Sequence, residues 1–117
     1  NLIEEERLRI EKHLSLQPED RRALSLGGVW MYTFSNKARG LELMEKALEL
    51  YPDESGTLFN GACLYSRAGQ TERALDLLEK AINKGFGYKE WIDNDPDYDN
   101  LRNLPRFKEL MHQLEQR

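Results

Sequence analysis

The feature that most constrains the fold of this chain is an internal repeat with a period of 34 residues. The segments Glu11-Lys12-His13-Leu14, Glu45-Lys46-Ala47-Leu48 and Glu79-Lys80-Ala81-Ile82 begin 34 residues apart. Further pairs that keep this register are Pro18 and Pro52, Leu24 and Leu58, Gly27 and Gly61, Leu41 and Leu75, and Gly40 and Ala74. A fixed period of this length predicts an array of similar supersecondary elements.

Apolar residues within each repeat follow a helical spacing of about 3.6 residues. Leu24, Gly28 and Met31 form one such stripe on the stretch that follows Pro18, and proline is tolerated only in the first turn of a helix. No segment shows the alternation of a strand. The pattern predicts antiparallel helix pairs. The expected helices lie near residues 2–16, 20–34, 37–50, 54–68 and 71–84.

The last third of the chain departs from the repeat. Pro96 falls in the middle of the next expected helix, where a proline costs about 3 kcal/mol. We therefore expect helix only up to about Trp91-Ile92, then an irregular segment over 93–103 with one short turn, and a final helix that opens at Pro105. This helix is expected to fold back over the last helix pair. Its apolar face consists of Phe107, Leu110, Met111 and Leu114.

Composition excludes several classes of protein. The 117 residues include 17 Lys and Arg against 21 Asp and Glu, so the net charge of −4 offers no broad basic surface to nucleic acid. The single cysteine, Cys63, rules out an intramolecular disulfide and a cysteine-rich zinc site. No apolar run is long enough to span a membrane, and the start is unlike a signal peptide. We expect a cytoplasmic protein that binds neither nucleic acid nor membrane.

The period, the small residues and the prolines together resemble the tetratricopeptide-repeat (TPR) family. That family closes its repeats with a proline, here Pro18 and Pro52, although Phe86 occupies the next such position. The resemblance implies an all-α fold, a right-handed α-solenoid of antiparallel helix pairs (a TPR-like superhelix) with a C-terminal capping helix. It also places small residues where helices cross. These are Gly28, Gly40 and Ala47 in one repeat, and Ala62, Ala74 and Ala81 in the next.

This resemblance divides the chain into four parts. Residues 1–17 correspond to the second helix of a truncated repeat, 18–51 and 52–85 to two repeats, and 86–117 to a degenerate repeat with the capping helix. The segment 95–107 is similar to the closing segment of many bacterial proteins of the family, in which it is often joined to regulatory domains. We therefore expect the C-terminal end of a longer array in a bacterial-type multidomain protein.

The resemblance also implies a binding groove on the concave surface, lined by the first helices of successive repeats. In this groove Asn60 would hold a peptide backbone, Tyr32 and Phe59 would offer apolar contact, and the arginines would meet a carboxylate. An equal alternative is that Val29 and Cys63 face the core and the rest are ordinary surface. The groove residues carried over are Arg22, Ser25, Val29, Tyr32, Phe59, Asn60, Cys63 and Arg67.

Candidate catalytic and metal sites are few. Asp93, Asp95 and Asp97 match positions 1, 3 and 5 of a calcium-binding EF-hand loop, but Tyr98 and Leu104 replace the glycine and glutamate that such a loop needs. Aspartates that cap short turns are the alternative. The two histidines lack the spacing of metal ligands, and no nucleophile motif is present. We therefore expect no enzyme activity, no cofactor and no bound metal.

Three hypotheses for function follow. The first is a non-catalytic protein–protein interaction or scaffolding module, which binds a peptide or partner domain within a larger regulatory protein. The second is self-association into a homodimer through the truncated N-terminal edge, where Ile3 and Ile10 are expected to be exposed and His13 occupies the position of a small residue. The third is a calcium or small-ligand sensor that uses residues 93–99.

Overall fold

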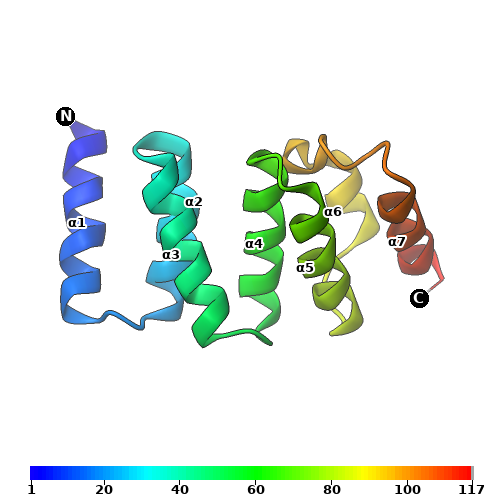
Figure 1. Cartoon of the computed structure of the whole chain (residues 1–117), viewed down its shortest axis with the longest axis horizontal. Coiled ribbons are helices and arrows are strands. Elements are labelled where there is room, and N and C mark those ends of the chain that lie inside the picture. The colour runs from blue at the N-terminus through cyan, green and yellow to red at the C-terminus, as the bar shows by residue number, and fades with distance from the viewer. Residues whose placement is uncertain (117) are drawn as a thin grey trace. The chain divides into compact units, whose positions relative to one another are not determined.

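The computed structural model describes residues 1–116 and comprises two compact units, Asn1–Asp53 and Glu54–Arg117. Every regular element of the described residues is helical, which confirms an all-α fold (Figure 1). The first five helices agree with the expected ranges to within one residue at each end. The elements are α1 (Leu2–Leu16), α2 (Arg21–Phe34), α3 (Lys37–Leu50), α4 (Ser55–Arg67), α5 (Thr71–Asn83), α6 (Lys89–Asn94), the 3₁₀ helix η1 (Pro96–Tyr98) and α7 (Pro105–Glu115).

The three helices of the first unit each begin at a side-chain cap. The carboxamide of Asn1, the carboxylate of Asp20 and the carboxamide of Asn36 each accept a hydrogen bond from a backbone N–H three residues later, at 2.9, 3.1 and 2.9 Å. Such caps satisfy amide groups that have no partner within the helix and contribute about 1 kcal/mol each. Local sequence therefore accounts for where α1, α2 and α3 begin.

The crossing of α2 and α3 depends on two glycines. A Cβ atom at Gly40 would lie 2.6 Å from both the carbonyl oxygen of Gly28 and the backbone nitrogen of Tyr32. A Cβ at Gly28 would lie 2.9 Å from the carbonyl oxygen of Gly40. Because these neighbours are backbone atoms, the two helices approach more closely than any side chain permits. Met31 and Met44 are completely buried in the same unit.

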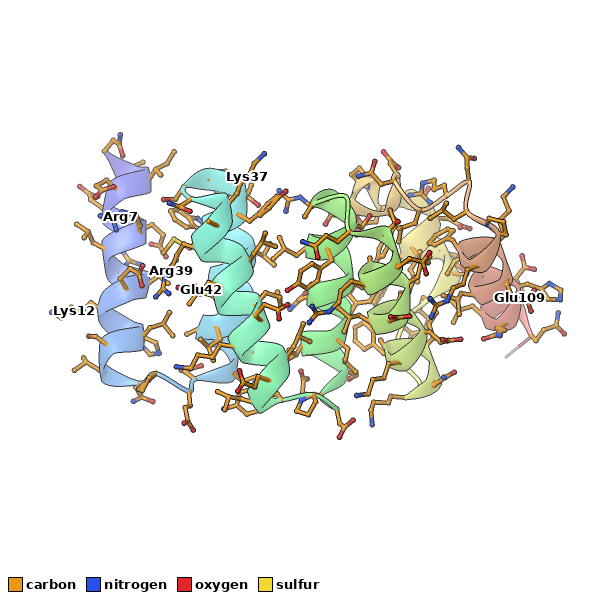
Figure 2. All side chains as sticks on the ribbon, viewed as in Figure 1. Arg7, Lys12, Lys37, Arg39, Glu42 and Glu109 are labelled. Carbon is orange, nitrogen blue, oxygen red and sulfur yellow. The ribbon has the colours of Figure 1, made fainter. Side chains whose placement is uncertain are left out.

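Helix α1 is held against this pair by a polar and an apolar contact. Arg39 on α3 donates hydrogen bonds at 3.0 and 2.7 Å to the carboxylate of Glu11 on α1, and it also pairs with Glu42 (Figure 2). Leu14 is the buried apolar residue of α1. The hydroxyl of Tyr51, which follows α3, donates to the backbone carbonyl of Glu19 in the loop between α1 and α2.

The second unit is built on the α4–α5 pair, with α7 packed on α5 and α6. The final helix begins at Pro105 as predicted, and all four of its expected apolar residues are buried. Arg106 ties α7 to the surface of α5 through the carboxylates of Asp76 and Glu79, at 2.7 and 2.9 Å. The predicted part 86–117 ends at Arg117, which lies outside the described residues.

The connection from α5 to α7 is irregular, as the proline break predicted. Helix α6 ends at Asn94, and Pro96 then begins η1. Arg102 closes the connection, because its guanidinium donates to the carbonyl oxygens of Ile92 and Asp95 at 3.1 and 2.6 Å. The core residues that the connection supplies are all fully buried. They are Ile92, Tyr98 and Leu101.

No helix within residues 1–116 combines the length and the apolar character that crossing a membrane requires.

Candidate docking groove

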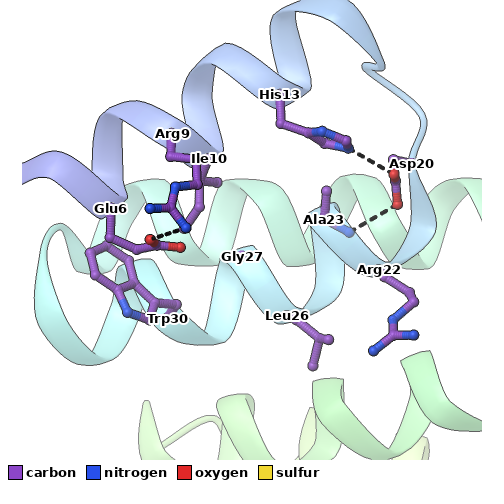
Figure 3. Close-up of a pocket in the computed structure, with 10 residues that line it drawn as sticks. All are labelled: Glu6, Arg9, Ile10, His13, Asp20, Arg22, Ala23, Leu26, Gly27 and Trp30. Atoms are coloured by element: carbon purple, nitrogen blue, oxygen red, sulfur yellow. Dashed lines mark hydrogen bonds and ion pairs between the residues drawn. The ribbon is translucent and has the colours of Figure 1, made fainter. Parts of the chain in front are cut away.

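A cleft of about 500 Å³ lies between α1 and α2 in the first unit (Figure 3). A second hollow of about 200 Å³ continues it toward the start of α1 and the end of α2. The two hollows share Glu6 and Trp30, so they form one trough, which we call the α1–α2 groove. The residues that line it are Leu2, Ile3, Glu6, Arg9, Ile10, His13, Asp20, Arg22, Ala23, Leu26, Gly27, Trp30 and Phe34.

The apolar part of the α1–α2 groove is a stripe on α2. Leu26, Trp30 and Phe34 are spaced four residues apart, so they lie on one face of the helix. Leu26 is 46% exposed and Phe34 54% exposed, and the rings of Trp30 and Phe34 lie 5.6 Å apart. Leu2 and Ile3 of α1 extend this surface with exposed fractions of 82% and 45%. The first unit therefore presents large apolar side chains to solvent along a concave surface.

Gly27 makes room for the floor of the groove. A Cβ atom there would lie 3.2 Å from Cγ2 of Ile10, a branch methyl group of a side chain on α1. The glycine thus lets Ile10 settle against the backbone of α2, where it is only half-buried and still lines the cleft. Ile3 is exposed, as expected for the N-terminal edge, whereas Ile10 is partly covered.

The charged residues of the groove are paired, with one exception. Arg9 lies 3.4 Å from Glu6, and Nε2 of His13 lies 2.8 Å from Oδ2 of Asp20 (Figure 3). The hydrogen bond from His13, followed by that from the backbone of Ala23, holds the pKa of Asp20 below its usual value of 3.8. The guanidinium of Arg22 has no hydrogen-bond or ion-pair partner among residues 1–116. One cation at the end of the groove near the start of α2 is therefore available to a ligand.

Only one of the four groove residues predicted in the first unit lines this cleft. Arg22 does so and is exposed. Ser25 is 2% exposed, and its hydroxyl donates to the carbonyl of Arg21 at 3.1 Å. Val29 and Tyr32 are half-buried and line no part of the α1–α2 groove. The alternative placed Val29 in the core and Ser25 on the surface, whereas Ser25 is buried and Val29 is half-buried.

The four residues predicted in the second unit contribute mainly to packing inside it. The ring of Phe59 lies 4.8 Å from that of Phe86 and 5.8 Å from that of Tyr98. Arg67 lies 3.8 Å from Asp97, and Asn60 is half-buried. Residues of the C-terminal connection therefore cover part of this set. Peptide binding by the eight predicted residues stays a prediction.

Cys63, the fourth of these residues, is a packing residue of the second unit. It is 8% exposed, and its thiol donates to the hydroxyl of Tyr98 at 3.1 Å. Burial raises the pKa of the Cys63 thiol to about 12. A thiolate is the form that binds metals and attacks electrophiles, so this cysteine is poorly suited to either role at neutral pH.

The aspartates of residues 93–99 all have partners within the protein. Asp93 accepts from Lys89 at 2.6 Å, and Asp99 accepts from Arg102 at 2.9 Å. Asp95 caps η1 by accepting from the backbone of Asp97 at 2.9 Å. Sγ of Cys63 and one carboxylate oxygen each of Asp95 and Asp97 lie within 4.8 Å of one another. Burial is the main reason that the pKa of Asp97 is raised. The arrangement is that of a capped turn, the alternative to an EF-hand.

A comparison with protein families gives a match that covers most of the chain. The family model described as "A/B hydrolase-like, N-terminal domain" matches residues 29–117. This chain belongs to the A/B hydrolase-like N-terminal domain family. No curated protein and no solved structure matches it.

Membership of this family corrects the resemblance described above. The assignment to the tetratricopeptide-repeat family is wrong, because the matching family is the A/B hydrolase-like N-terminal domain. The repeated small residues on which that assignment depended are a general feature of packed helix pairs. Small residues such as Gly40 and Ala74 recur wherever helices of similar length pack in antiparallel pairs, because the crossing point falls at the same place in each pair.

The A/B hydrolase-like N-terminal domain shows no catalytic triad in its described residues. α/β-Hydrolases use a serine nucleophile hydrogen-bonded to a histidine, which is oriented by a carboxylate. His13 does bind Asp20, and His112 lies 3.9 Å from Glu115. Within residues 1–116, however, neither histidine is hydrogen-bonded to the side chain of a serine, threonine or cysteine.

The apolar residues of the groove were missed at the level of sequence. The helix over 21–34 carries two apolar stripes, of which only the one through Leu24, Gly28 and Met31 was identified from the sequence. The second, through Leu26, Trp30 and Phe34, was the available signal. A helix that is apolar on most of its circumference needs a second covering surface.

Proposed function

We propose that this chain is a non-catalytic docking domain that binds a segment of an attached α/β-hydrolase domain in the α1–α2 groove. The observation that carries this proposal is the partly exposed stripe of Leu26, Trp30 and Phe34 beside the exposed side chains of Leu2 and Ile3. Contiguous apolar surface of this kind is uncommon on monomeric proteins and marks sites of protein interaction. The family description, "A/B hydrolase-like, N-terminal domain", suggests a hydrolase domain in the same gene product as the partner.

The composition of the groove supports a protein partner. Tryptophan and arginine are the residues most enriched at the energetic centres of protein interfaces, and the groove offers Trp30 and Arg22. Shape points the same way, because a trough between two helices accepts a third element along its length.

A separate argument supports the non-catalytic part of the proposal. Hydrolysis by a serine enzyme needs a nucleophile within hydrogen-bond reach of its base. His13 in the groove is hydrogen-bonded to the carboxylate of Asp20 at 2.8 Å, as a triad histidine would be, but among residues 1–116 no serine, threonine or cysteine side chain is hydrogen-bonded to it. We therefore assign hydrolysis to the attached domain and docking to this one.

The binding test uses the α/β-hydrolase domain of the same gene product, produced as a separate polypeptide, and the 117-residue chain. Isothermal titration should show a 1:1 complex. Leu26→Glu should weaken it at least tenfold, because this change places an unpaired charge in an apolar contact. The matched control is Leu8→Glu, since Leu8 is similarly exposed at 53% but lines no part of the groove. Equal loss in both variants, no complex, or a gene product without such a domain would refute the proposal.

The non-catalytic assignment has its own test. A fluorophosphonate probe labels activated serines of hydrolases covalently. We expect it to label the separate hydrolase domain and to leave the 117-residue chain unlabelled. Labelling of the chain that disappears in His13→Ala would contradict the assignment.

Self-association is a second candidate, favoured by the exposure of Leu8 and Leu16 on α1 at 53% and 74%. Sedimentation equilibrium at several concentrations tests it. A dimer that Leu8→Glu dissociates and Leu26→Glu preserves would support self-association through a face of α1 outside the groove. A monomer at all concentrations would exclude it. The right-handed solenoid that the resemblance implied stays a prediction, and neither candidate function requires it.

A further inference from the structure

We infer that the segment bound in the α1–α2 groove is an amphipathic α-helix with a carboxylate at the end that lies beside Arg22. This inference rests on the proposed docking function and specifies the chemistry of the partner. Three observations carry it: the length and direction of the apolar stripe, the backbone chemistry of the groove walls, and the distribution of charge along the groove.

The stripe on α2 has the dimensions of a short helix. Arg22, Leu26, Trp30 and Phe34 follow one another at intervals of four residues, so they form a continuous row that is inclined to the axis of α2. At 1.5 Å per residue, this row is roughly 18 Å long. A helix of about 12–16 residues, laid between α1 and α2, would match it with apolar side chains at i, i+4, i+7 and i+11.

The groove walls favour a helix over an extended strand. A strand gains affinity by pairing its backbone with a free sheet edge. Both walls here are helices, α1 and α2, whose backbone groups are hydrogen-bonded along their own length. A bound strand would leave its own N–H and C=O groups unpaired against Leu26 and Trp30, which is costly in an apolar contact. The backbone N–H and C=O groups of a bound α-helix are already hydrogen-bonded to each other within the helix.

Charge distinguishes the two ends of the groove. Within it, Glu6 is paired with Arg9, and Asp20 with His13. Arg22 is the exposed cation that remains without a partner among residues 1–116. A guanidinium binds a carboxylate through two parallel hydrogen bonds, so Arg22 is complementary to an Asp or Glu on the partner.

Among the described residues that line the other end of the groove, beside the start of α1, there is no unpaired cation that would attract a carboxylate. The residues that line it are Leu2, Ile3, Trp30 and Phe34, together with Glu6, which already has a partner. A carboxylate placed there would meet apolar side chains and one negative charge. The charges therefore place the acidic residue of the partner helix at the end of the groove beside Arg22, whichever way the partner helix runs.

The experiment uses the 117-residue chain and a set of synthetic helical peptides of about 16 residues that share leucines at i, i+4, i+7 and i+11. Three peptides carry Glu, Gln or Lys at one terminal position, and a fourth has the leucines in scrambled order. Trp91→Phe leaves Trp30 as the single tryptophan, so its fluorescence reports binding in the groove. We expect affinity to fall in the order Glu, Gln, Lys by about fivefold per step, with the scrambled peptide unbound.

Arg22→Glu provides the decisive control, because Arg22 is exposed and its side chain holds no other group in place. In this variant the order should reverse, with the Lys peptide binding best. If both proteins give the same order, or if the Glu and Lys peptides bind equally, the proposed carboxylate beside Arg22 is wrong. The docking function would still stand in that case if Leu26→Glu abolishes binding. Binding of the scrambled peptide as tightly as the ordered one would overturn the helix. Failure of all peptides, together with failure of the hydrolase domain to bind, would overturn both proposals.

Discussion

The close approach of α2 and α3 gives the sharpest prediction, because two neighbouring glycines on α2 face different kinds of atom. A Cβ at Gly28 would lie 2.9 Å from the carbonyl oxygen of Gly40, whereas a Cβ at Gly27 would lie 3.2 Å from the methyl carbon Cγ2 of Ile10. The first contact is with the backbone of α3 and the second with a mobile side chain. Gly28→Ala and Gly27→Ala are therefore a matched pair, with the same change in composition and helix propensity.

The magnitude follows from two opposing contributions. Gly→Ala in a helix interior gains about 1 kcal/mol from propensity. Non-bonded carbon atoms pack at roughly 3.5–4.0 Å, so α2 and α3 must separate by several tenths of an ångström to admit the methyl group of Gly28→Ala. Overpacking of this kind costs about 1–3 kcal/mol. Gly40→Ala should be worse, because its Cβ would lie 2.6 Å from two backbone atoms of α2.

We expect Gly40→Ala to lower the free energy of unfolding of the first unit by about 2 kcal/mol net, and Gly28→Ala by about 1 kcal/mol. Gly27→Ala should be neutral or stabilising by up to about 1 kcal/mol, since the half-buried side chain of Ile10 needs to shift by only a few tenths of an ångström. The difference between Gly40→Ala and Gly27→Ala corresponds to roughly 10 °C in Tm.

The assay is urea and thermal unfolding followed by the fluorescence of Trp30 in the Trp91→Phe background, which reports on the first unit alone. Ala38→Gly on the exposed side of α3 supplies the reference for propensity, with an expected loss of about 1 kcal/mol. If Gly40→Ala proves as stable as Gly27→Ala, the close backbone approach of α2 and α3 is wrong.

Two further predictions concern titratable groups. Burial raises the pKa of the Cys63 thiol from 9.0 to about 12. Iodoacetamide at pH 8 should therefore alkylate Cys63 about a thousandfold more slowly in the native protein than in urea, as followed by mass spectrometry. Fast labelling of the native protein would show that the thiol is accessible. The pKa of Asp20 is lowered by His13, so its stabilising contribution is present above its usual value of 3.8 and is lost as pH falls below it. The pKa of Asp97 is raised above 3.8 mainly by burial, so its charged form costs stability, and protonation relieves this cost as pH falls through the raised pKa, before the contribution of Asp20 is lost. Between pH 6 and pH 3, the urea midpoint should therefore fall less in Asp20→Asn than in the wild type, and more in Asp97→Asn; identical profiles would contradict both assignments.

Much of the fold was predictable because it depends on local chemistry. Helix boundaries follow from side-chain caps such as Asp20 and Asn36 and from prolines such as Pro105, all of which act within a few residues of where they stand. The break at Pro96 follows from the loss of one backbone donor. The burial of the apolar face of α7 follows from helical periodicity alone.

The candidate site was less predictable because it depends on which of two apolar faces a helix buries. Both Met31 and Trp30 lie on apolar stripes of α2, and periodicity alone does not rank them. The structure buries Met31 completely and leaves the stripe of Trp30 partly exposed. The covering of Cys63 by Tyr98, which lies 35 residues further along the chain, likewise depends on tertiary packing.

The two helix crossings show why a regular period in sequence does not establish a regular structure. Gly40 and Ala74 occupy the same register, 34 residues apart, as do Gly28 and Ala62. At the α2–α3 crossing a single added Cβ meets the neighbouring backbone at 2.6–2.9 Å. The α4–α5 crossing already contains both alanine side chains, fully buried. The backbones of α4 and α5 must therefore stand further apart at this register than those of α2 and α3. Equivalent positions in the period thus occupy unequal spaces, so the period describes the length of a helix pair and is compatible with more than one family.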